Sequence, residues 1–381
     1  GGSGGFGGMS LSQPSVPVNS FSIRTNNASV PTGTSLSNPR SRGYYVEHLD
    51  LFMHFFSRSQ GKKSLTGLQV STDTIHWVLR TFPLATSTGG DWHWQETGLG
   101  YNPPAASDGN QIVVSNQAYS STAHTLASST DTIHWTLRTS AKPPEFQDPN
   151  GLGYGNNVWI QSYRVNDITT STDAIHWELR TFGNDTKIGS FAYGSGTWVA
   201  NSAYNTYVFT STDAIHWKAR TSGIPSSYRG YQLAYGNGRF AYGTYRNISY
   251  STDGISWTAR SQENMHYVYG FGYYPNTNQW LIIDYYGRGF VSDFDIPAHL
   301  NWQTSSGYFQ DYVNNIIVGA NGKKTIIPSQ DNDAATYGIY GAVLQIGAGN
   351  GGNGVFGGGG GGAASVAKAT LSGQGGDGGD G

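Results

Sequence analysis

The sequence predicts an all-β fold, a β-propeller of seven blades. Three observations support this prediction: a short phrase that recurs along the chain, the regular distance between its copies, and glycine-rich turns between them. Four of the five intervals between the serines that begin successive copies are 40 to 42 residues, and the first is 58. A fixed period of this size is typical of propellers, in which each repeat forms one four-stranded blade. The six serines are Ser71, Ser129, Ser171, Ser211, Ser251 and Ser292.

The repeated phrase predicts a tight turn followed by a strand. It reads STDTIHW at Ser71 and STDAIHW at Ser171. A serine and an aspartate two residues apart can accept hydrogen bonds from nearby backbone N–H groups and close a turn. The tryptophan four residues after each aspartate then begins the next strand and packs against a neighbouring blade. The aspartates expected to close these turns are Asp73, Asp131, Asp173, Asp213, Asp253 and Asp293.

In this form the phrase resembles the Asp-box, S-x-D-x-G-x-x-W, of sialidase-like propellers. The resemblance covers roughly residues 20–345 and departs from the family pattern in three ways. Isoleucine occupies the usual glycine place, Gly254 lies one place early, and the sixth copy has a five-residue insertion before Trp302. The resemblance implies the propeller architecture but no activity, because Asp-boxes occur in enzymes, receptors and adhesins alike.

The ends of the repeat region predict how the ring closes. Each blade reads as strand A, a glycine turn, strand B, a loop, strand C, the repeated phrase (called the box from here on) and strand D. Strand D has the pattern W-x-(L/A)-R. The residues around Phe21 to Asn26 resemble a strand D with no preceding partners, and residues 311–341 offer strands A to C with no strand D. We therefore expect the N-terminal strand to complete the last blade, which removes free sheet edges. This divides the chain into a glycine-rich segment (1–19), the propeller (20–346) and a second glycine-rich segment (347–381).

Composition excludes several functions. A net charge of −2 gives no attraction to nucleic acid, and the absence of an apolar run of about 18 residues argues against membrane insertion. The lack of cysteine rules out disulfides and thiolate metal sites. We expect no metal and no cofactor, because the box histidines occupy the same place in four different blades and cannot converge. They are His76, His134, His176 and His216. The repeated arginines of strand D also occupy the same place in different blades and cannot converge. We interpret them as partners of turn carboxylates or carbonyls.

Candidate binding residues lie where the repeat is interrupted. Trp92 and Trp94 belong neither to a box nor to a strand B, and they lie in the long connection that makes the first interval 58 residues. Such D-to-A connections share one face of a propeller with the B-to-C loops, opposite the boxes. Exposed aromatic side chains on that face can stack on sugar rings or anchor a protein partner. The other candidates are Tyr204, Tyr228, Tyr245 and Tyr285, with Tyr119, Tyr163 and Tyr308 as further possibilities; packing between blades is the alternative for each tyrosine.

The glycine-rich ends complete the sequence-based hypothesis. Residues 347–381 contain 17 glycines, and glycine-rich strands can pack backbone to backbone because they lack Cβ atoms; a flexible linker is the alternative. A box-containing propeller with such ends and no cysteine resembles a bacteriophage tail-fibre or appendage protein. The resemblance implies a virion or extracellular location, contacts with other appendage subunits through the glycine-rich segments, and a homo-oligomer.

The function expected from this reasoning is a non-enzymatic adhesin that recognises cell-surface glycan. One alternative is a sialidase-like glycan hydrolase, which requires three arginines that converge on a carboxylate and a tyrosine activated by a glutamate. Residues outside the repeat that could serve are Arg164, Arg229, Arg246 and Glu263. The other alternative is a purely structural virion scaffold, whose loop face would contact only other subunits.

Overall fold

In the described part of the chain, every regular element is a β-strand except one short 3-10 helix, η1 (Glu47–Leu49). This architecture comes from a computed structural model of the full sequence. The structure describes residues 22–25, 40–60, 63–80, 104–115, 125–139, 151–163, 167–182, 186–202, 207–220, 224, 232–261, 265–275, 278–285, 288–292, 303–308, 312–313, 317–319, 324–330 and 339–343.

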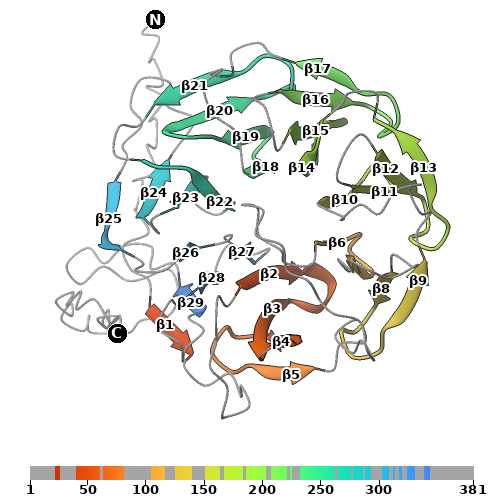
Figure 1. Ribbon diagram of the computed structural model, residues 1–381. Coiled ribbons are helices and arrows are strands. Elements are labelled where there is room, and N and C mark those ends of the chain that lie inside the picture. The colour runs from red at the N-terminus through yellow and green to blue at the C-terminus, as the bar shows by residue number, and fades with distance from the viewer. Residues whose placement is uncertain are drawn as a thin grey trace, which may run out of the picture.

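The strands pair into six four-stranded sheets and one five-stranded sheet, which are arranged around a ring (Figure 1). In five of them the structure describes side chains in all four strands, and each is an antiparallel meander that follows chain order. Their strands are β2 (Arg40–Val46), β3 (Leu51–Gln60), β4 (Lys63–Ser71) and β5 (Val78–Arg80); β6 (Ala105–Ser107), β7 (Ile112–Ser115), β8 (Thr125–Ser129) and β9 (Thr136–Thr139); β10 (Gly151–Gly155), β11 (Val158–Ser162), β12 (Asp167–Ser171) and β13 (Glu178–Thr181); β14 (Ile188–Gly194), β15 (Thr197–Ser202), β16 (Val208–Ser211) and β17 (Lys218–Arg220); and β18 (Gln232–Gly236), β19 (Arg239–Gly243), β20 (Asn247–Ser251) and β21 (Thr258–Ser261).

Two further sheets contain strands whose side chains are not described. One is formed by β22 (Val268–Tyr274), β23 (Gln279–Asp284), β24 (Arg288–Ser292) and β25 (Gln303–Tyr308). The other combines the two ends of the repeat region and contains β26 (Tyr312–Val313), β27 (Ile317–Val318), β28 (Lys324–Gln330), β29 (Ile339–Val343) and β1 (Ser22–Thr25). In this last sheet β1 pairs antiparallel with β29, with Ser22 opposite Gly341.

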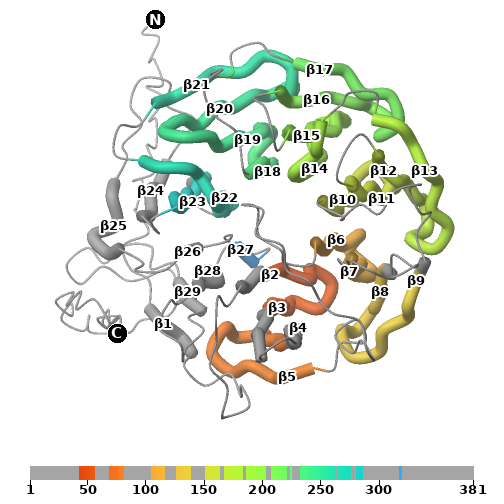
Figure 2. The backbone as a smooth tube through the Cα atoms, in the orientation of Figure 1, coloured from red at the N-terminus to blue at the C-terminus, as the bar shows by residue number. Residues whose placement is uncertain are grey.

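An all-β propeller is therefore the observed fold, with five regular four-stranded blades from β2 to β21 (Figure 2). The expected strand order, with the box between the third and fourth strands, is present in each of these blades. The finer expectation of seven blades, closed by the N-terminal strand, depends on the two sheets just described and is considered under the proposed function.

In three of the regular blades, the first two strands are joined by hairpin turns of the kind that their glycines and asparagines predict. Ser195 and Gly196 have φ angles of 48° and 76°, and Asn237 and Gly238 have 48° and 69°. Two successive residues with positive φ form the hairpin turn whose twist matches that of its strands. The cost of this backbone is low for glycine and asparagine, so the sequence determines where each hairpin reverses.

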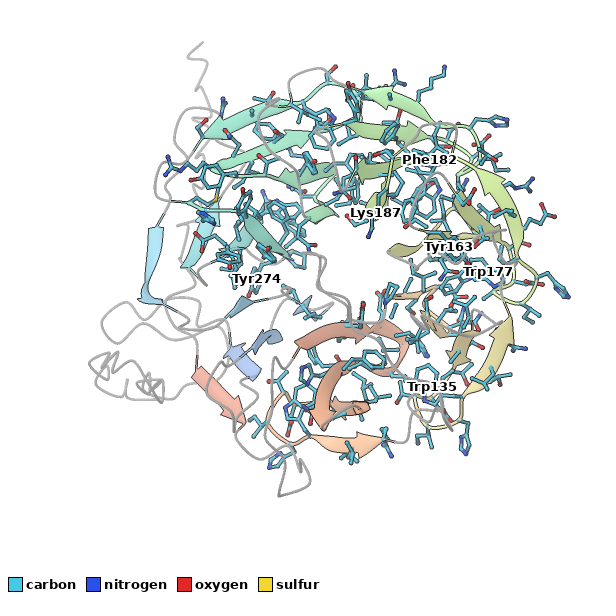
Figure 3. The ribbon with its side chains drawn as sticks, in the orientation of Figure 1. Trp135, Tyr163, Trp177, Phe182, Lys187 and Tyr274 are labelled. Atoms are coloured by element: carbon cyan, nitrogen blue, oxygen red, sulfur yellow. The ribbon has the colours of Figure 1, made fainter. Side chains whose placement is uncertain are left out.

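The hydrophobic core lies between blades. One cluster joins Ile160 of β11 to Ile188 and Trp198 of the next sheet, and the strand-B tryptophans Trp159, Trp198 and Trp280 are at most 2% exposed. The box tryptophans Trp135 and Trp177 lie farther from the centre of the ring than Lys187 (Figure 3). Each blade thus buries apolar surface against its neighbours, and no blade has a complete core of its own.

A contact between tyrosine and glycine recurs at these interfaces. The last residue of strand A is a glycine in three successive sheets, and each of these glycines contacts a tyrosine of the following sheet. A Cβ added to Gly155 would lie 2.3 Å from Cγ of Tyr193, and one added to Gly194 would lie 2.2 Å from the ring of Tyr235. The third pair is Gly236 and Tyr273, where an added Cβ would lie 2.7 Å from Cγ of the tyrosine. The Tyr-Gly dipeptide at the end of strand A therefore lets the next blade approach closely.

Candidate functional site

The loops that join strand B to strand C, and one blade to the next, lie on the face opposite the boxes. Because each of the six four-stranded sheets is an antiparallel meander, the A-to-B turns and the boxes share one end of these blades, and the B-to-C loops lie at the other end. Strand D also ends there, so the D-to-A connections reach the same face. We call this the loop face.

A cluster of aromatic side chains bridges two neighbouring blades on the loop face. Tyr245 follows β19, His266 and Tyr267 precede β22, and Tyr285 follows β23. The ring centroids of Tyr245 and Tyr267 are 4.9 Å apart, and the ring of His266 lies 4.9 Å from Tyr245, 4.8 Å from Tyr267 and 5.4 Å from Tyr285. Tyr269 extends the group through its contact with Tyr285, at 5.5 Å. We call these five residues the aromatic cluster.

Backbone hydrogen bonds hold the three segments of the cluster together. The N–H of Tyr285 donates to the carbonyl oxygen of Tyr267 at 2.7 Å, and Tyr245 and Tyr267 form an isolated antiparallel bridge. The carboxylate of Asp284, which is fully buried, accepts a hydrogen bond from the N–H of His266 at 2.9 Å. The bridge between Tyr245 and Tyr267 joins consecutive blades, and the other two bonds lie within the second of them, so the aromatic rings stand on a fixed frame and not on independent loops.

Arg246 adds a positive charge to the edge of the cluster. Its side chain is exposed, and its guanidinium carbon lies 5.0 Å from the centre of the Tyr245 ring, which is a cation–π distance. Its backbone has a φ of 57°, a left-handed conformation that costs more for arginine than for glycine or asparagine.

The chemistry of the cluster suits a ligand with both apolar and polar faces. All five aromatic side chains are half-buried, so part of each ring remains accessible. Tyrosine rings can stack on the C–H face of a pyranose while hydroxyl and guanidinium groups bond its oxygens. The only carboxylate in residues 244–247, 265–269 and 284–285 is the buried Asp284, so these segments hold no pair of accessible carboxylates of the kind that a glycosidase uses.

The boxes at the opposite end of the blades form closed turns. In all five described copies, one carboxylate oxygen of the aspartate accepts the backbone N–H groups two and three residues later, at 2.7 to 2.9 Å. The serine hydroxyl donates to the same oxygen at 2.9 to 3.1 Å. The fourth residue of each copy has a positive φ of 60° to 73°. The left-handed residue of this turn is therefore the one directly after the aspartate, which is glycine in the fifth copy, at Gly254.

The box histidines are each paired with the aspartate of their own turn. In four copies the imidazole Nδ1 lies 2.6 to 2.7 Å from the second carboxylate oxygen, and the imidazoles are 85–86% exposed. For Asp131 and Asp173, the hydrogen bond from the imidazole and then those from the backbone hold the pKa of the carboxyl well below its ordinary value of 3.8. Among the described residues, no three histidine, aspartate or glutamate side chains are placed to hold a metal ion.

The interpretation of the strand-D arginines needs a correction. They were expected to partner turn carboxylates or carbonyls, but Arg138 and Arg220 donate from Nε to hydroxyls of strand C, at 3.2 Å to Ser128 and 2.9 Å to Thr210. The physical reason is register: Arg220 lies opposite Val208, two residues before Thr210 on the paired strand, and its long side chain reaches along that strand. These arginines tie strand D to its own blade.

We expect Asp173→Ala to destabilise the fold without affecting ligand binding by the loop face. The substitution removes two hydrogen bonds to backbone N–H groups and the imidazole contact, which is worth about 1–3 kcal/mol in free energy of unfolding. Chemical denaturation of the variant measures the loss, and ligand binding at a temperature where the variant is folded provides the control. Loss of binding at unchanged stability would assign recognition to the box face instead.

Several residues proposed from the sequence lie outside the described residues. They are Trp92, Trp94, Tyr119, Arg164, Tyr204, Tyr228, Arg229, Glu263 and Asp293, together with both glycine-rich segments. Tyr308 is in β25, but its side chain is not described. Tyr163 is 1% exposed and donates its hydroxyl to Gln161 at 3.0 Å, which agrees with the alternative of packing between blades.

The structure brings two of the proposed residues, Tyr245 and Tyr285, into one group and adds three aromatic side chains that sequence reasoning missed. His266, Tyr267 and Tyr269 belong to the run Met-His-Tyr-Val-Tyr at the end of a D-to-A connection. A signal was available: this run places two aromatic side chains directly before strand A and a third at its second residue, and the repeat does not require them.

Comparison with known proteins supports the fold alone. Solved structures similar to this chain include YCF48 bound to D1 peptide (14% identity, TM-score 0.54, covering 83% of this chain and 93% of that one). Others are YCF48 from Cyanidioschyzon merolae (10% identity, TM-score 0.54, 82% and 97%) and the WD40 β-propeller domain of Doa1 (11% identity, TM-score 0.55, 84% and 97%). No protein-family model and no curated protein sequence matches the chain. None of the described helical residues forms a helix that could cross a membrane.

Proposed function

We propose that this protein is an adhesin of a virion or other extracellular appendage and that it binds cell-surface glycan without cleaving it. The observation that carries the proposal is the aromatic cluster: half-buried tyrosine rings and an exposed arginine, fixed between two blades by backbone hydrogen bonds. Rings that are already ordered lose little conformational entropy when a ligand binds, so a sugar gains most of the stacking free energy. Trp92 and Trp94 extend the same binding face in this proposal.

The sequence features outside the cluster support the location. The proposal keeps the resemblance of the repeated phrase to the Asp-box and that of the whole chain to phage tail-fibre proteins. In it, the glycine-rich segments 1–19 and 347–381 pack against other appendage subunits, and the protein acts as a homo-oligomer. Low charge and the absence of cysteine are compatible with this use.

The ring that presents the cluster is proposed to have seven blades, the last of which is completed by the N-terminal strand. The pairing of β1 with β29 supports this closure. Deletion of residues 21–26 should then unfold or oligomerise the protein, because the last sheet loses its outer strand and exposes an edge. Thermal unfolding and size-exclusion chromatography measure the effect. A truncated chain that stays monomeric with an unchanged melting temperature would contradict the closure.

The glycan proposal predicts that the cluster tyrosines are needed for attachment. Replacing Tyr245 and Tyr285 together by alanine should weaken binding to host cells or isolated surface polysaccharide by about tenfold or more, since each lost stacking contact is worth about 1 kcal/mol. Tyr207→Ala is the matched control, because this tyrosine is 43% exposed on the loop face but lies in another blade. The control variant should bind like the unmodified protein.

The same assay separates the alternatives. Release of reducing sugar from the polysaccharide would favour a hydrolase, and unchanged attachment by the double variant would transfer recognition to other loops such as that of Trp92 and Trp94. A structural scaffold would bind no glycan and would instead use the loop face for a protein partner. One similar propeller, YCF48, has been solved with a bound peptide, so a test of peptide binding to the loop face is a suitable comparison experiment.

A further inference from the structure

The exposed charge of the aromatic cluster is positive. Residues 244–247, 265–269 and 284–285, which form the cluster and its frame, contain one arginine and one carboxylate. The arginine, Arg246, is exposed, whereas the carboxylate of Asp284 is fully buried and accepts the N–H of His266. A ligand placed on the tyrosine rings therefore meets a guanidinium and no exposed carboxylate from these segments.

Hydrogen bonds fix the backbone on both sides of the arginine. Its N–H donates to the carbonyl oxygen of His266 at 3.4 Å, and the side-chain amide of Asn247 donates to the carbonyl oxygen of Tyr245 at 3.0 Å. Asn247 is itself fixed, because Ser261 donates to its side-chain oxygen at 2.6 Å. The left-handed backbone at Arg246 is thus supported on both sides, and the guanidinium lies over the Tyr245 ring.

A guanidinium that stacks on an aromatic ring can still donate hydrogen bonds. The cation–π contact uses its face, and the N–H groups point outward in the guanidinium plane, where they match the paired oxygens of a carboxylate or phosphate. A neutral sugar hydroxyl accepts only one of these bonds. The arrangement therefore favours an anionic group next to the stacked ring.

We propose that the aromatic cluster binds an anionic saccharide, with the sugar ring on the tyrosines and its carboxylate or phosphate on Arg246. This inference rests on the proposed glycan-binding function and specifies the chemical class of the ligand. It assigns different roles to neighbouring residues: the tyrosines bind the ring of any suitable sugar, and Arg246 determines the preference for charge.

The experiment measures the binding of the full chain to matched pairs of purified bacterial surface polysaccharides. One set contains hexuronic acids, each compared with its carboxyl-reduced form, and the other carries phosphate monoesters, each compared with its dephosphorylated form. We expect the anionic member of at least one pair to bind about tenfold or more tightly, because a charge-assisted bidentate contact is worth about one such factor. The pair that shows the preference identifies the charged group.

Variants of the arginine test its role separately from that of the rings. Arg246→Gln should reduce the preference to about one while residual binding of the neutral form persists, and Tyr245→Ala should weaken both forms. Arg239→Gln is the matched control, because Arg239 begins the same strand, β19, at the opposite face of the ring. Melting temperatures of all variants establish that each is folded.

The outcomes distinguish the two proposals. Equal binding of both members of every pair, together with a loss caused by Tyr245→Ala, would overturn the anionic preference and leave the glycan function standing. A preference that Arg246→Gln does not change would also overturn it, because the charge would then be recognised elsewhere. No binding to any polysaccharide in either form would overturn both proposals.

Discussion

Gly155→Ala is expected to destabilise the propeller by about 3 kcal/mol or to prevent folding, which is at the upper end of the cost of overpacking a core. The added Cβ would lie 2.3 Å from Cγ and 2.5 Å from Cβ of Tyr193 in the next blade. These atoms are next to the backbone, so the tyrosine cannot swing away and the two sheets must separate. Chemical denaturation, or the soluble yield of the variant, measures the effect.

At Gly194 the same kind of clash can be relieved by a second substitution. A Cβ at Gly194 would lie 2.2 to 2.3 Å from the outer atoms of the Tyr235 ring, which packs on Phe240 with a centroid distance of 4.8 Å. Shortening Tyr235 to alanine removes those atoms, so Gly194→Ala should cost much less in a Tyr235→Ala background than in the unmodified protein. Equal costs in both backgrounds would show that the close approach to Tyr235 is not what requires glycine.

The second large effect is expected from pH. His54 is fully buried in the first regular blade, 2.8 Å from the side-chain nitrogen of Gln69, and burial lowers its pKa from 6.5 to about 3. Between these two pH values the unfolded chain binds a proton that the folded chain excludes. The stability that comes from burying the neutral imidazole is therefore fully present above pH 6.5. The free energy of unfolding falls as the pH decreases toward 3, by about 2 kcal/mol at pH 5.

Denaturation at pH 8, 6.5, 5 and 4 measures this loss, and His54→Gln serves as the comparison because it cannot titrate. The variant should lose most of the slope between pH 6.5 and 4. A slope that remains in the variant would mean that another group titrates in this range. The box aspartates affect stability only at lower pH. Because folding lowers the pKa of these carboxyls, the stability that they contribute is fully present above about pH 4 and is lost only below it.

The two effects arise in different parts of the ring. The glycines at the end of strand A make room for the neighbouring blade, and His54 is a polar group that the packing has excluded from water. The effect of the glycines follows from the fact that the core lies between blades, so that a local change acts on two sheets at once. This explains why single substitutions far from the loop face are expected to have larger effects on stability than those within the aromatic cluster.

Much of this protein was determined by the sequence alone. The repeated phrase, its period and the glycine turns predicted the propeller, the order of strands in each regular blade and the hairpins at Asn237 and Gly238, because these depend on local turn chemistry and on short-range pairing. The structure added detail that only backbone angles reveal, such as the left-handed residue after each box aspartate, which the sequence marks with glycine at Gly254 alone.

The candidate site was decided by the tertiary structure. Tyr245 and Tyr285 were identified because they follow strand B, but the sequence could not show that His266, Tyr267 and Tyr269 lie between them, since that proximity depends on how two blades pack. Likewise, the role of Gly155 depends on Tyr193, which lies 38 residues later in the chain and approaches it only across a blade interface. A repeat determines its own unit through local interactions, whereas the contacts between units arise only when the ring assembles.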